Sequence, residues 1–269
     1  MVKTRRLGDP QGLPALLAHC FLGHGGTWGR MLAAMGVPLD ALAFDMPGHG
    51  QSPMPADPGD FHALVAGVVG DLVRRPSLMI GHSFGGASVL RHALHHPETV
   101  TGMVLIEPVA FCVARDEPEF AAYAPVEFAL HRVIEQGGLV EAARQFLALN
   151  PGSPEFDSLP PAAQAQMAQQ MRLALATVQG LFGDSGGMAR PGGLESFTAP
   201  VLLMLGSETT PIFRATVRAL AARLPHAEVV VIEGAGHMLP ISHPEETGRH
   251  LRDWLERTGQ GTEAGIGAP

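Results

Sequence analysis

The sequence predicts an α/β fold in which a doubly wound, mostly parallel sheet of about seven strands packs between helices. Two observations carry this prediction. Short apolar runs alternate with amphipathic stretches along most of the chain, as expected when strands buried on both faces are joined by helices. The alternation breaks once, across 111–197, where helical patterns occur without a convincing strand. A chain of 269 residues is long enough for one such core with one insertion.

Each predicted element follows from its local pattern. Six apolar runs are predicted to be buried strands, namely 15–21, 41–45, 78–82, 103–107, 201–205 and 229–232. Residues 3–7 are predicted to add one short strand at an antiparallel edge. The predicted core helices are 61–74, 84–96, 211–224 and 244–257. The last of these opens with Pro244 and two glutamates, which suit a helix N-terminus.

The predicted elements divide the chain into a core, a cap and a tail. Residues 1–110 and 198–258 are expected to form the core, and residues 111–197 an all-helical cap inserted after the strand that ends at Glu107. Cap helices are expected near 117–136, 138–149 and 160–181, the last with an apolar stripe that packs onto the core. Residues 259–269 are rich in glycine and polar residues, so we expect a disordered tail there.

Charge and cysteine content exclude several classes of function. The net charge is −8 with only 18 Lys and Arg, which argues against binding to nucleic acid or to an anionic membrane surface. Cys20 and Cys112 match neither a disulfide framework nor a metal-ligand spacing. No apolar run approaches the length of a membrane span. We therefore expect a cytoplasmic protein that acts on a small molecule. A monomer or a homodimer is expected, without a cofactor or a metal.

Gly81-His82-Ser83-Phe84-Gly85 lies between a predicted strand and a predicted helix and is the strongest functional signal in the chain. A serine on a sharp strand-to-helix turn takes strained backbone angles, and glycines two positions away on each side let neighbouring backbone approach. The turn directs the Ser83 hydroxyl out of the sheet. Because the pentapeptide alone is equally compatible with an ordinary loop, its position between strand and helix carries the prediction of a nucleophile.

A base for this serine is predicted in Gly234-Ala235-Gly236-His237, which follows the last predicted strand. Its glycines allow a tight loop at the edge of the sheet where Ser83 also lies. A serine hydroxyl needs a base at neutral pH, and histidine has a suitable pKa. Of thirteen histidines, His237 is the one on a glycine-hinged loop after the last strand, so we predict that it is the general base.

Two further motifs complete a resemblance to a known family. Residues 19–21, His-Cys-Phe, resemble an oxyanion loop, and residues 45–52 match the turn pattern Asp-x-Pro-Gly-x-Gly-x-Ser. With the serine motif and the final Gly-His, the chain resembles the α/β-hydrolase fold superfamily, as an esterase-like serine hydrolase with a helical cap. The resemblance implies that the backbone N–H groups of Phe21 and Phe84 form the oxyanion hole. Cys20 stands where the family usually has glycine, which affects the shape of the loop rather than the donor.

The acidic member of the predicted triad has two candidates. The family usually places an aspartate three residues after the glycine that ends the strand before the last, and this chain has Thr209 there. Glu208 is one residue earlier and is the alternative acid. Glu107 ends the strand after the serine motif, where haloalkane dehalogenases of the same fold carry their acid. We favour Glu107, whose role would be to hold the His237 tautomer and stabilise its charged form.

The resulting expectation is hydrolysis of a small carboxylic ester or lactone through an acyl-enzyme on Ser83. We expect His24, His82 and Met238 to line the substrate pocket, with the His82 ring turned away from the nucleophile. The cap is expected to act as a lid and to contribute apolar residues to an acyl pocket, the candidates being Phe111, Phe120, Phe128, Leu130 and Phe146.

Other functions share the same residues. Carbon–carbon bond hydrolysis, cofactor-free perhydrolysis and acyl-homoserine lactone opening use the same triad, so the nucleophile is more firmly predicted than the reaction. A ligand receptor or regulator could also keep the triad and use the lidded pocket only for recognition. Dependence of ester turnover on Ser83 separates the enzymes from the receptor.

Overall fold

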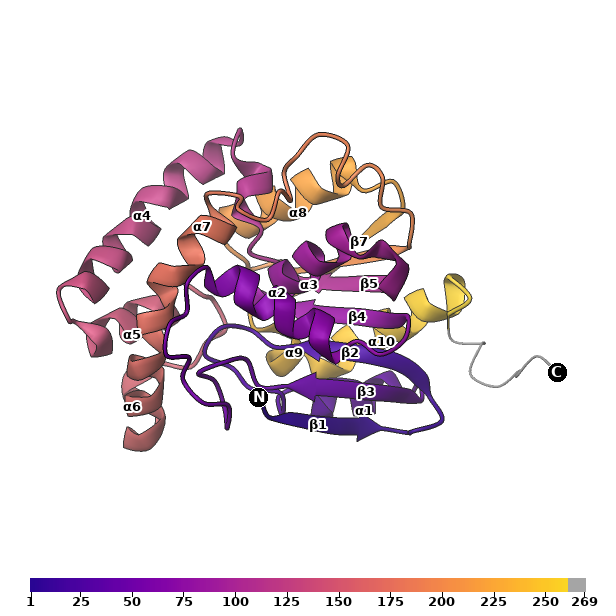
Figure 1. Cartoon of the computed structure of the whole chain (residues 1–269), viewed down its shortest axis with the longest axis horizontal. Coiled ribbons are helices and arrows are strands. Elements are labelled where there is room, and N and C mark those ends of the chain that lie inside the picture. The colour runs from indigo at the N-terminus through magenta and orange to yellow at the C-terminus, as the bar shows by residue number, and fades with distance from the viewer. Residues whose placement is uncertain (261–269) are drawn as a thin grey trace.

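The computed structural model describes residues 1–260, which form a seven-stranded sheet with helices on both faces (Figure 1). The strand order is β1-β3-β2-β4-β5-β6-β7. β1 (Thr4–Gly8) pairs antiparallel with β3 (Leu39–Phe44), and every other pairing is parallel. The other strands are β2 (Leu13–Ala18), β4 (Ser77–His82), β5 (Val100–Ile106), β6 (Val201–Gly206) and β7 (Ala227–Ile232). The predicted fold class, including the short antiparallel edge strand, is confirmed.

Helices cover the two faces of the sheet as separate layers. One face packs against α2 (Phe61–Leu72), α3 (Phe84–His95) and α8 (Pro211–Arg223). The other face packs against α9 (Leu239–Ser242), α10 (Pro244–Arg257) and α1 (Gly29–Met35), a short helix absent from the sequence prediction. Large apolar side chains such as Trp28 and Trp254 are fully buried in this second layer, and their burial anchors α1 and α10 to the sheet.

The last strand differs from its prediction as a fully buried strand. Val229 and Val231 of β7 are 47% and 48% exposed. β7 lies at the edge of the sheet and pairs only with β6, so the side chains on one of its faces are not covered by a helix. An apolar run therefore located the strand correctly but gave the wrong burial for it.

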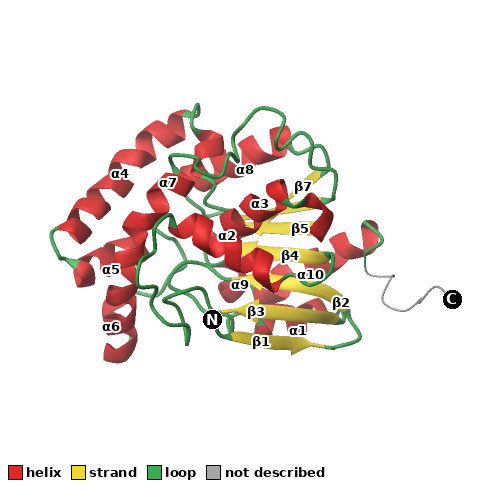
Figure 2. Ribbon diagram, in the orientation of Figure 1, coloured by secondary structure: helices red, strands yellow, loops and turns green. Residues whose placement is uncertain are grey.

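The segment 111–197 lies at the carboxyl ends of the parallel strands (Figure 2). It contains α4 (Pro118–Glu135), α5 (Leu139–Ala148), α6 (Pro161–Gln170) and α7 (Val178–Leu181). Short 3₁₀ segments cover Phe111–Ala114, Phe156–Ser158 and Met171–Thr177. The predicted helix over 160–181 is thus interrupted by a 3₁₀ segment that begins at Met171. The division into a core and a cap stays a prediction.

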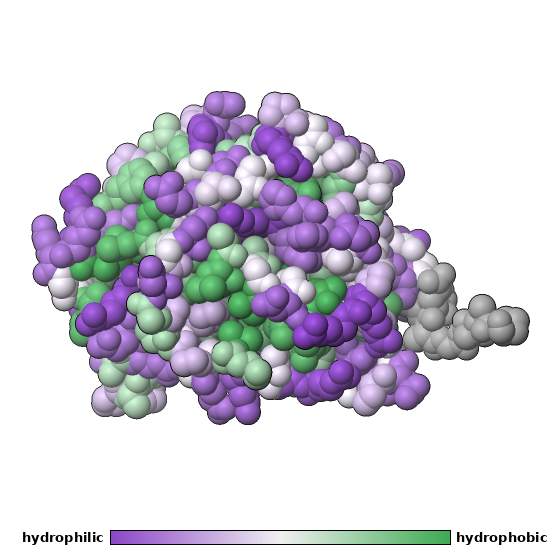
Figure 3. All heavy atoms as spheres, in the orientation of Figure 1, coloured by the Kyte–Doolittle hydropathy of each residue, from purple (hydrophilic) through white to green (hydrophobic). Residues whose placement is uncertain are grey.

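The last described residue, Gln260, is held by two hydrogen bonds. Gln260 donates from its backbone N–H to Leu255 and from its side chain to Thr101, whereas 261–269 of the predicted tail lie outside the described residues. Polar residues are spread over the face seen in Figure 3, and apolar residues gather at its left, over the cap segment, and in further groups near its centre. Val126 and Phe128 of α4 are among the exposed apolar side chains. Within residues 1–260, no helix combines the length and the apolar character needed to span a membrane.

Candidate active site

Ser83 occupies the sharp turn between β4 and α3. Its backbone angles are φ 56° and ψ −117°, a conformation that is strained for a residue with a side chain. A Cβ on Gly81 would lie 2.6 Å from the Gly85 carbonyl oxygen, and a Cβ on Gly85 would lie 2.1 Å from the Ala18 carbonyl oxygen. Only glycine therefore fits at these two positions, and the local sequence explains how the turn closes.

His237 lies next to Ser83 and connects it to Glu107. The His237 Nε2 atom lies 2.9 Å from Ser83 Oγ, and Nδ1 lies 2.7 Å from Glu107 Oε2. A carboxylate accepts hydrogen bonds, so the proton of neutral His237 is on Nδ1 and Nε2 can accept from Ser83. The Phe213 ring stacks on the imidazole with centroids 4.3 Å apart. All three polar residues are buried.

Glu107 follows the last residue of β5 and has a positive φ of 41°. Its Oε1 accepts from the Gly206 backbone N–H at 2.8 Å, and its Oε2 accepts from Thr209 Oγ1 at 2.7 Å. These bonds and the bond from His237 satisfy a carboxylate that is 0% exposed. Thr209, which stands at the family's usual acid position, therefore supports the carboxylate that contacts the histidine.

Glu208 lies elsewhere. Its side chain is exposed and makes no hydrogen bond within the described chain, while its backbone N–H donates to Ala235. The structure thus places Glu107, rather than Glu208, beside His237.

His82 lies behind the histidine rather than in the pocket. Its Nε2 lies 2.9 Å from the His237 carbonyl oxygen, and the two rings are 5.0 Å apart. Burial, followed by the neighbouring His237, lowers the His82 pKa well below its usual value, so the ring is neutral and donates from Nε2. His82 does not line either cavity at Ser83, so its expected place in the pocket wall is corrected. It instead fixes the backbone that carries His237.

The predicted oxyanion loop lies beside the serine. Phe84 is the first residue of α3, so its N–H has no acceptor within the helix. The Phe21 N–H makes no hydrogen bond within residues 1–260. His19 Nδ1 lies 2.7 Å from the Cys20 carbonyl oxygen, and its Nε2 accepts from the Met46 N–H at 3.0 Å. Burial lowers the His19 pKa to about 3, so a neutral ring holds the peptide before Phe21.

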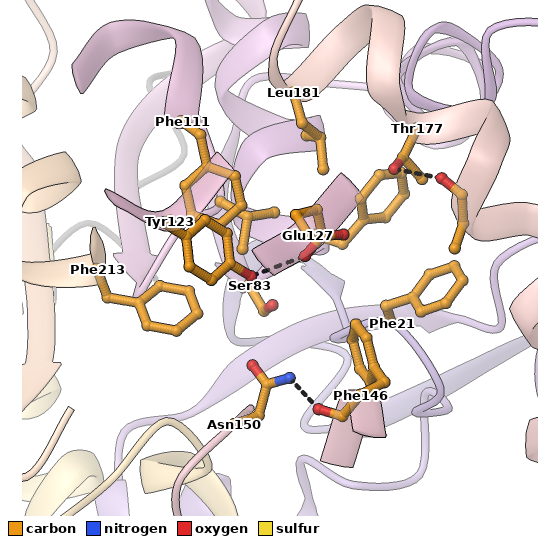
Figure 4. A pocket seen from close by; sticks show the side chains of 13 residues that line it. Phe21, Ser83, Phe111, Tyr123, Glu127, Phe146, Asn150, Thr177, Leu181 and Phe213 are labelled. Carbon is orange, nitrogen blue, oxygen red and sulfur yellow. Dashed lines mark hydrogen bonds between the residues drawn. The ribbon is translucent and has the colours of Figure 1, made fainter. Parts of the chain in front are cut away.

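Two cavities meet at Ser83. The first lies between α3 and the cap segment (Figure 4). The second, which is the larger of the two, lies between the oxyanion loop, the cap segment and His237. Ser83, Phe21, Phe146 and Asn150 line both cavities. A substrate attacked by Ser83 can therefore extend in two directions.

The predicted pocket residues are divided between the two cavities, and some line neither. His24 and Met238 line the second cavity. Phe111 and Phe146 line the first, whereas the other apolar candidates, Phe120, Phe128 and Leu130, line neither. Sequence reasoning missed four polar residues of the first cavity, namely Tyr123, Glu127, Asn150 and Thr177. The four-residue spacing of Tyr123 and Glu127, which places them on one helix face, was the available signal.

Comparisons with known proteins agree with the fold. Residues 15–249 match the alpha/beta hydrolase family. A pimeloyl-[acyl-carrier protein] methyl ester esterase of Aeromonas hydrophila is 25% identical over 246 residues, which cover 91% of this chain and 95% of the relative. The structure of an N-acyl homoserine lactone degrading enzyme is also 25% identical, with a TM-score of 0.62 and coverage of 94% and 97%. An esterase from Exiguobacterium antarcticum is 17% identical, with a TM-score of 0.71 and 95% of each chain covered.

Proposed function

The chain belongs to the alpha/beta hydrolase family and is a carboxylic ester hydrolase, and on this premise we propose that it cleaves a small ester or lactone through an acyl-enzyme on Ser83. The observation that carries the proposal is the buried hydrogen-bonded line from Ser83 through His237 to Glu107. Serine, base and acid stand in the order and at the distances that nucleophilic acyl transfer requires.

In the proposed reaction, Ser83 Oγ attacks the carbonyl carbon while its proton passes to His237 Nε2. Glu107 stabilises the imidazolium that forms and keeps the Nδ1 proton in place. The imidazolium then protonates the leaving oxygen as the ester bond breaks. A water molecule, deprotonated by the same nitrogen, attacks the acyl-enzyme, and the proton returns to Ser83 as the acid is released.

The N–H groups of Phe21 and Phe84 would bind the oxyanion of both tetrahedral intermediates. Each such donor contributes on the order of 3 kcal/mol to transition-state stabilisation. His19 acts as a positioning residue for this loop, because its neutral ring donates from Nδ1 to the Cys20 carbonyl oxygen, in the peptide before Phe21, and accepts at Nε2 from the Met46 N–H.

The position of His237 assigns the two cavities. His237 must reach the leaving oxygen to protonate it, and His237 lines the second cavity. The alcohol part of the substrate therefore occupies the second cavity. The acyl part occupies the first, whose wall includes Phe111 and Phe146 from the cap segment. The similarity to a methyl ester esterase and to a lactone degrading enzyme fits either an open-chain ester or a lactone as the substrate.

Hydrolysis of p-nitrophenyl esters of increasing acyl length tests the proposal. Wild type should release p-nitrophenol with burst kinetics, and Ser83→Ala should lose turnover by a factor of roughly 10⁴ or more. Mass spectrometry after treatment with a fluorophosphonate should place the adduct on Ser83. If no ester is turned over in a Ser83-dependent way, the proposal fails and a receptor that only binds the ligand becomes the better reading.

A further inference from the structure

The first cavity contains a buried carboxylate that the proposed chemistry does not use. Glu127 lies on α4, is 8% exposed and lines the cavity that also contains Ser83. Its Oε2 accepts from the Tyr123 hydroxyl at 2.8 Å. Figure 4 shows both side chains reaching from α4 toward the space above Ser83. Glu127 is thus part of the surface that an acyl group would contact.

The Tyr123 hydroxyl stays protonated and does not neutralise the carboxylate. Burial, together with the neighbouring Glu127, raises the pKa of Tyr123 well above its ordinary value. A neutral phenol gives one hydrogen bond and no positive charge. Two or three bonds or a cation are the usual partners of a carboxylate with so little exposure, so Tyr123 alone leaves Glu127 incompletely satisfied.

The remaining neighbour of Glu127 is His131, one helical turn further along α4. His131 Nε2 lies 3.3 Å from Glu127 Oε1, which is within ion-pair distance when the ring is protonated, but this nitrogen makes no hydrogen bond within residues 1–260. No Lys, Arg or His is among the described residues that line the cavity. Glu127 is therefore the one acidic or basic side chain among the described residues that line the cavity.

Two other buried polar groups add acceptors to the same wall. Asn150 donates from Nδ2 to the Phe146 carbonyl oxygen at 2.7 Å, which leaves its Oδ1 without a donor in the described chain. Thr177 donates its hydroxyl proton to the Ala174 carbonyl oxygen at 2.8 Å, so toward the cavity this oxygen can only accept. Around these acceptors the wall is aromatic and aliphatic, with Phe111, Phe146 and Leu181. The lining of this cavity thus matches the chemistry of a short apolar chain that ends in a hydrogen-bond donor.

We propose that Glu127 is a specificity residue that binds an ammonium group at the far end of the acyl chain while the ester carbonyl lies at Ser83. The substrate class is therefore esters or lactones of short amino acids whose amine is separated from the carboxyl carbon by an aliphatic chain. Acyl groups that end in a carboxylate are disfavoured, because Glu127 repels them. This inference rests on the proposed function, since it assigns the acyl group to the first cavity.

Three matched sets of methyl esters test the preference. Each set contains an ω-amino acid ester, a neutral ester of the same length and a half ester that ends in a carboxylate. β-Alanine, 4-aminobutyrate and 6-aminohexanoate are matched with butanoate, pentanoate and heptanoate, and with monomethyl succinate, glutarate and pimelate. At pH 7.5, in at least one set, wild type should favour the amino ester over the neutral ester by about tenfold or more in kcat/KM, and the carboxylate ester should be the poorest substrate.

Two isosteric variants test whether the preference for amino esters depends on Glu127. Glu127→Gln removes the charge and should reduce the ratio of amino ester to neutral ester to about 1. Glu135→Gln is the matched control, because it removes the same charge from an exposed position of the same helix, and its ratio should equal that of wild type. An amino-ester preference that survives in Glu127→Gln, or a wild-type ratio near 1 in every set, would overturn the inference.

A binding measurement covers the case in which Glu127→Gln does not fold. Isothermal titration calorimetry of Ser83→Ala with n-butylammonium and n-hexylammonium should give binding that butanoate and hexanoate do not give. Failure of the inference and failure of the proposed function are distinguishable. Ser83-dependent hydrolysis of neutral esters without any amino preference overturns only the role of Glu127, whereas the absence of Ser83-dependent hydrolysis of every ester overturns the proposed function.

Discussion

The two walls of the first cavity are built on different physical principles. The core wall presents Ser83, with His237 and Glu107 behind it, and the hydrogen bonds of Glu107 are complete and anchored at strand ends. The opposite wall, from the cap segment, presents Tyr123 and Glu127 of α4 together with aromatic rings, and its polar groups are only partly satisfied. The difference separates two tasks, because satisfied groups on a rigid sheet can hold reacting atoms in place while unsatisfied groups remain available to a ligand.

Removal of a catalytic side chain from the core wall should produce the largest loss of activity. His237→Ala removes the proposed base and the acid that protonates the leaving group, so kcat should fall by roughly 10⁴ or more. The loss should be nearly the same for every acyl group, because the proton transfer is common to all of them. A p-nitrophenyl ester series measures this, with circular dichroism as the check on folding. If the loss of kcat varied strongly with acyl length, the core wall would also contribute to selectivity, and the two walls would not have separate tasks.

The two candidate acids give the next largest difference. Glu107→Gln retains the shape of the side chain but weakens the bond to His237 Nδ1 and its electrostatic support, so kcat should fall by about 10² to 10⁴. Glu208→Gln changes an exposed side chain with no hydrogen bond in the described chain and should alter kcat by less than about threefold. Steady-state kinetics on one ester decides between them. The opposite ranking would show that Glu208 is the working acid.

The residues of the core wall could be predicted from the sequence, because each belongs to a short motif that directly follows a predicted strand. The glycine-flanked Ser83, the glycine-hinged His237 and the glutamate that ends a strand each follow an apolar run, and parallel strands bring their carboxyl ends to one edge. The paired contact between Glu107 and Thr209 was not readable, because a hydrogen bond between strand ends 102 residues apart leaves no periodic pattern.

The cap wall was only partly predictable for a different reason. Five aromatic or aliphatic residues were candidates for the acyl pocket, and the structure places only Phe111 and Phe146 in its wall. Helical periodicity identifies an apolar face but does not say whether that face meets the sheet, another cap helix or a cavity. The buried pair Tyr123 and Glu127 was missed because a glutamate on an amphipathic helix is usually solvated.

A cap residue should change selectivity more than rate. Phe146 lies between the two cavities and packs edge-on against Phe21, with ring centroids 5.6 Å apart. Phe146→Ala removes the aromatic ring at this junction, so the kcat/KM ratio of long to short acyl esters should rise by about tenfold. Phe128→Ala is the control, because Phe128 is 39% exposed and lines neither cavity. Equal changes of this ratio in both variants would mean that the cap affects selectivity only through its overall stability.

The pH dependence of the free energy of unfolding should also distinguish the core from the cap segment, and each substitution should have a smaller effect than those above. Among the described residues, the histidines whose pKa is lowered by burial all lie in the predicted core, and His49 is one of them, with a pKa of about 4. Its Nδ1 donates to the Pro47 carbonyl oxygen at 3.0 Å, and its ring stacks on Phe61. Between pH 6.5 and about 4, unfolded His49 binds a proton that the folded residue does not.

The free energy of unfolding should therefore decrease as the pH falls through this window, and His49 should contribute about 1.4 kcal/mol per pH unit to the slope. His49→Asn keeps a donor for Pro47 but does not titrate, so the slope between pH 6 and 5 should become shallower by that amount even if the variant is less stable at neutral pH. Urea unfolding at several pH values measures the slope, and above pH 7.5 the two proteins should show the same one. An unchanged slope below pH 6.5 would mean that folded His49 takes up its proton as readily as the unfolded chain, so that acid sensitivity originates in another part of the molecule.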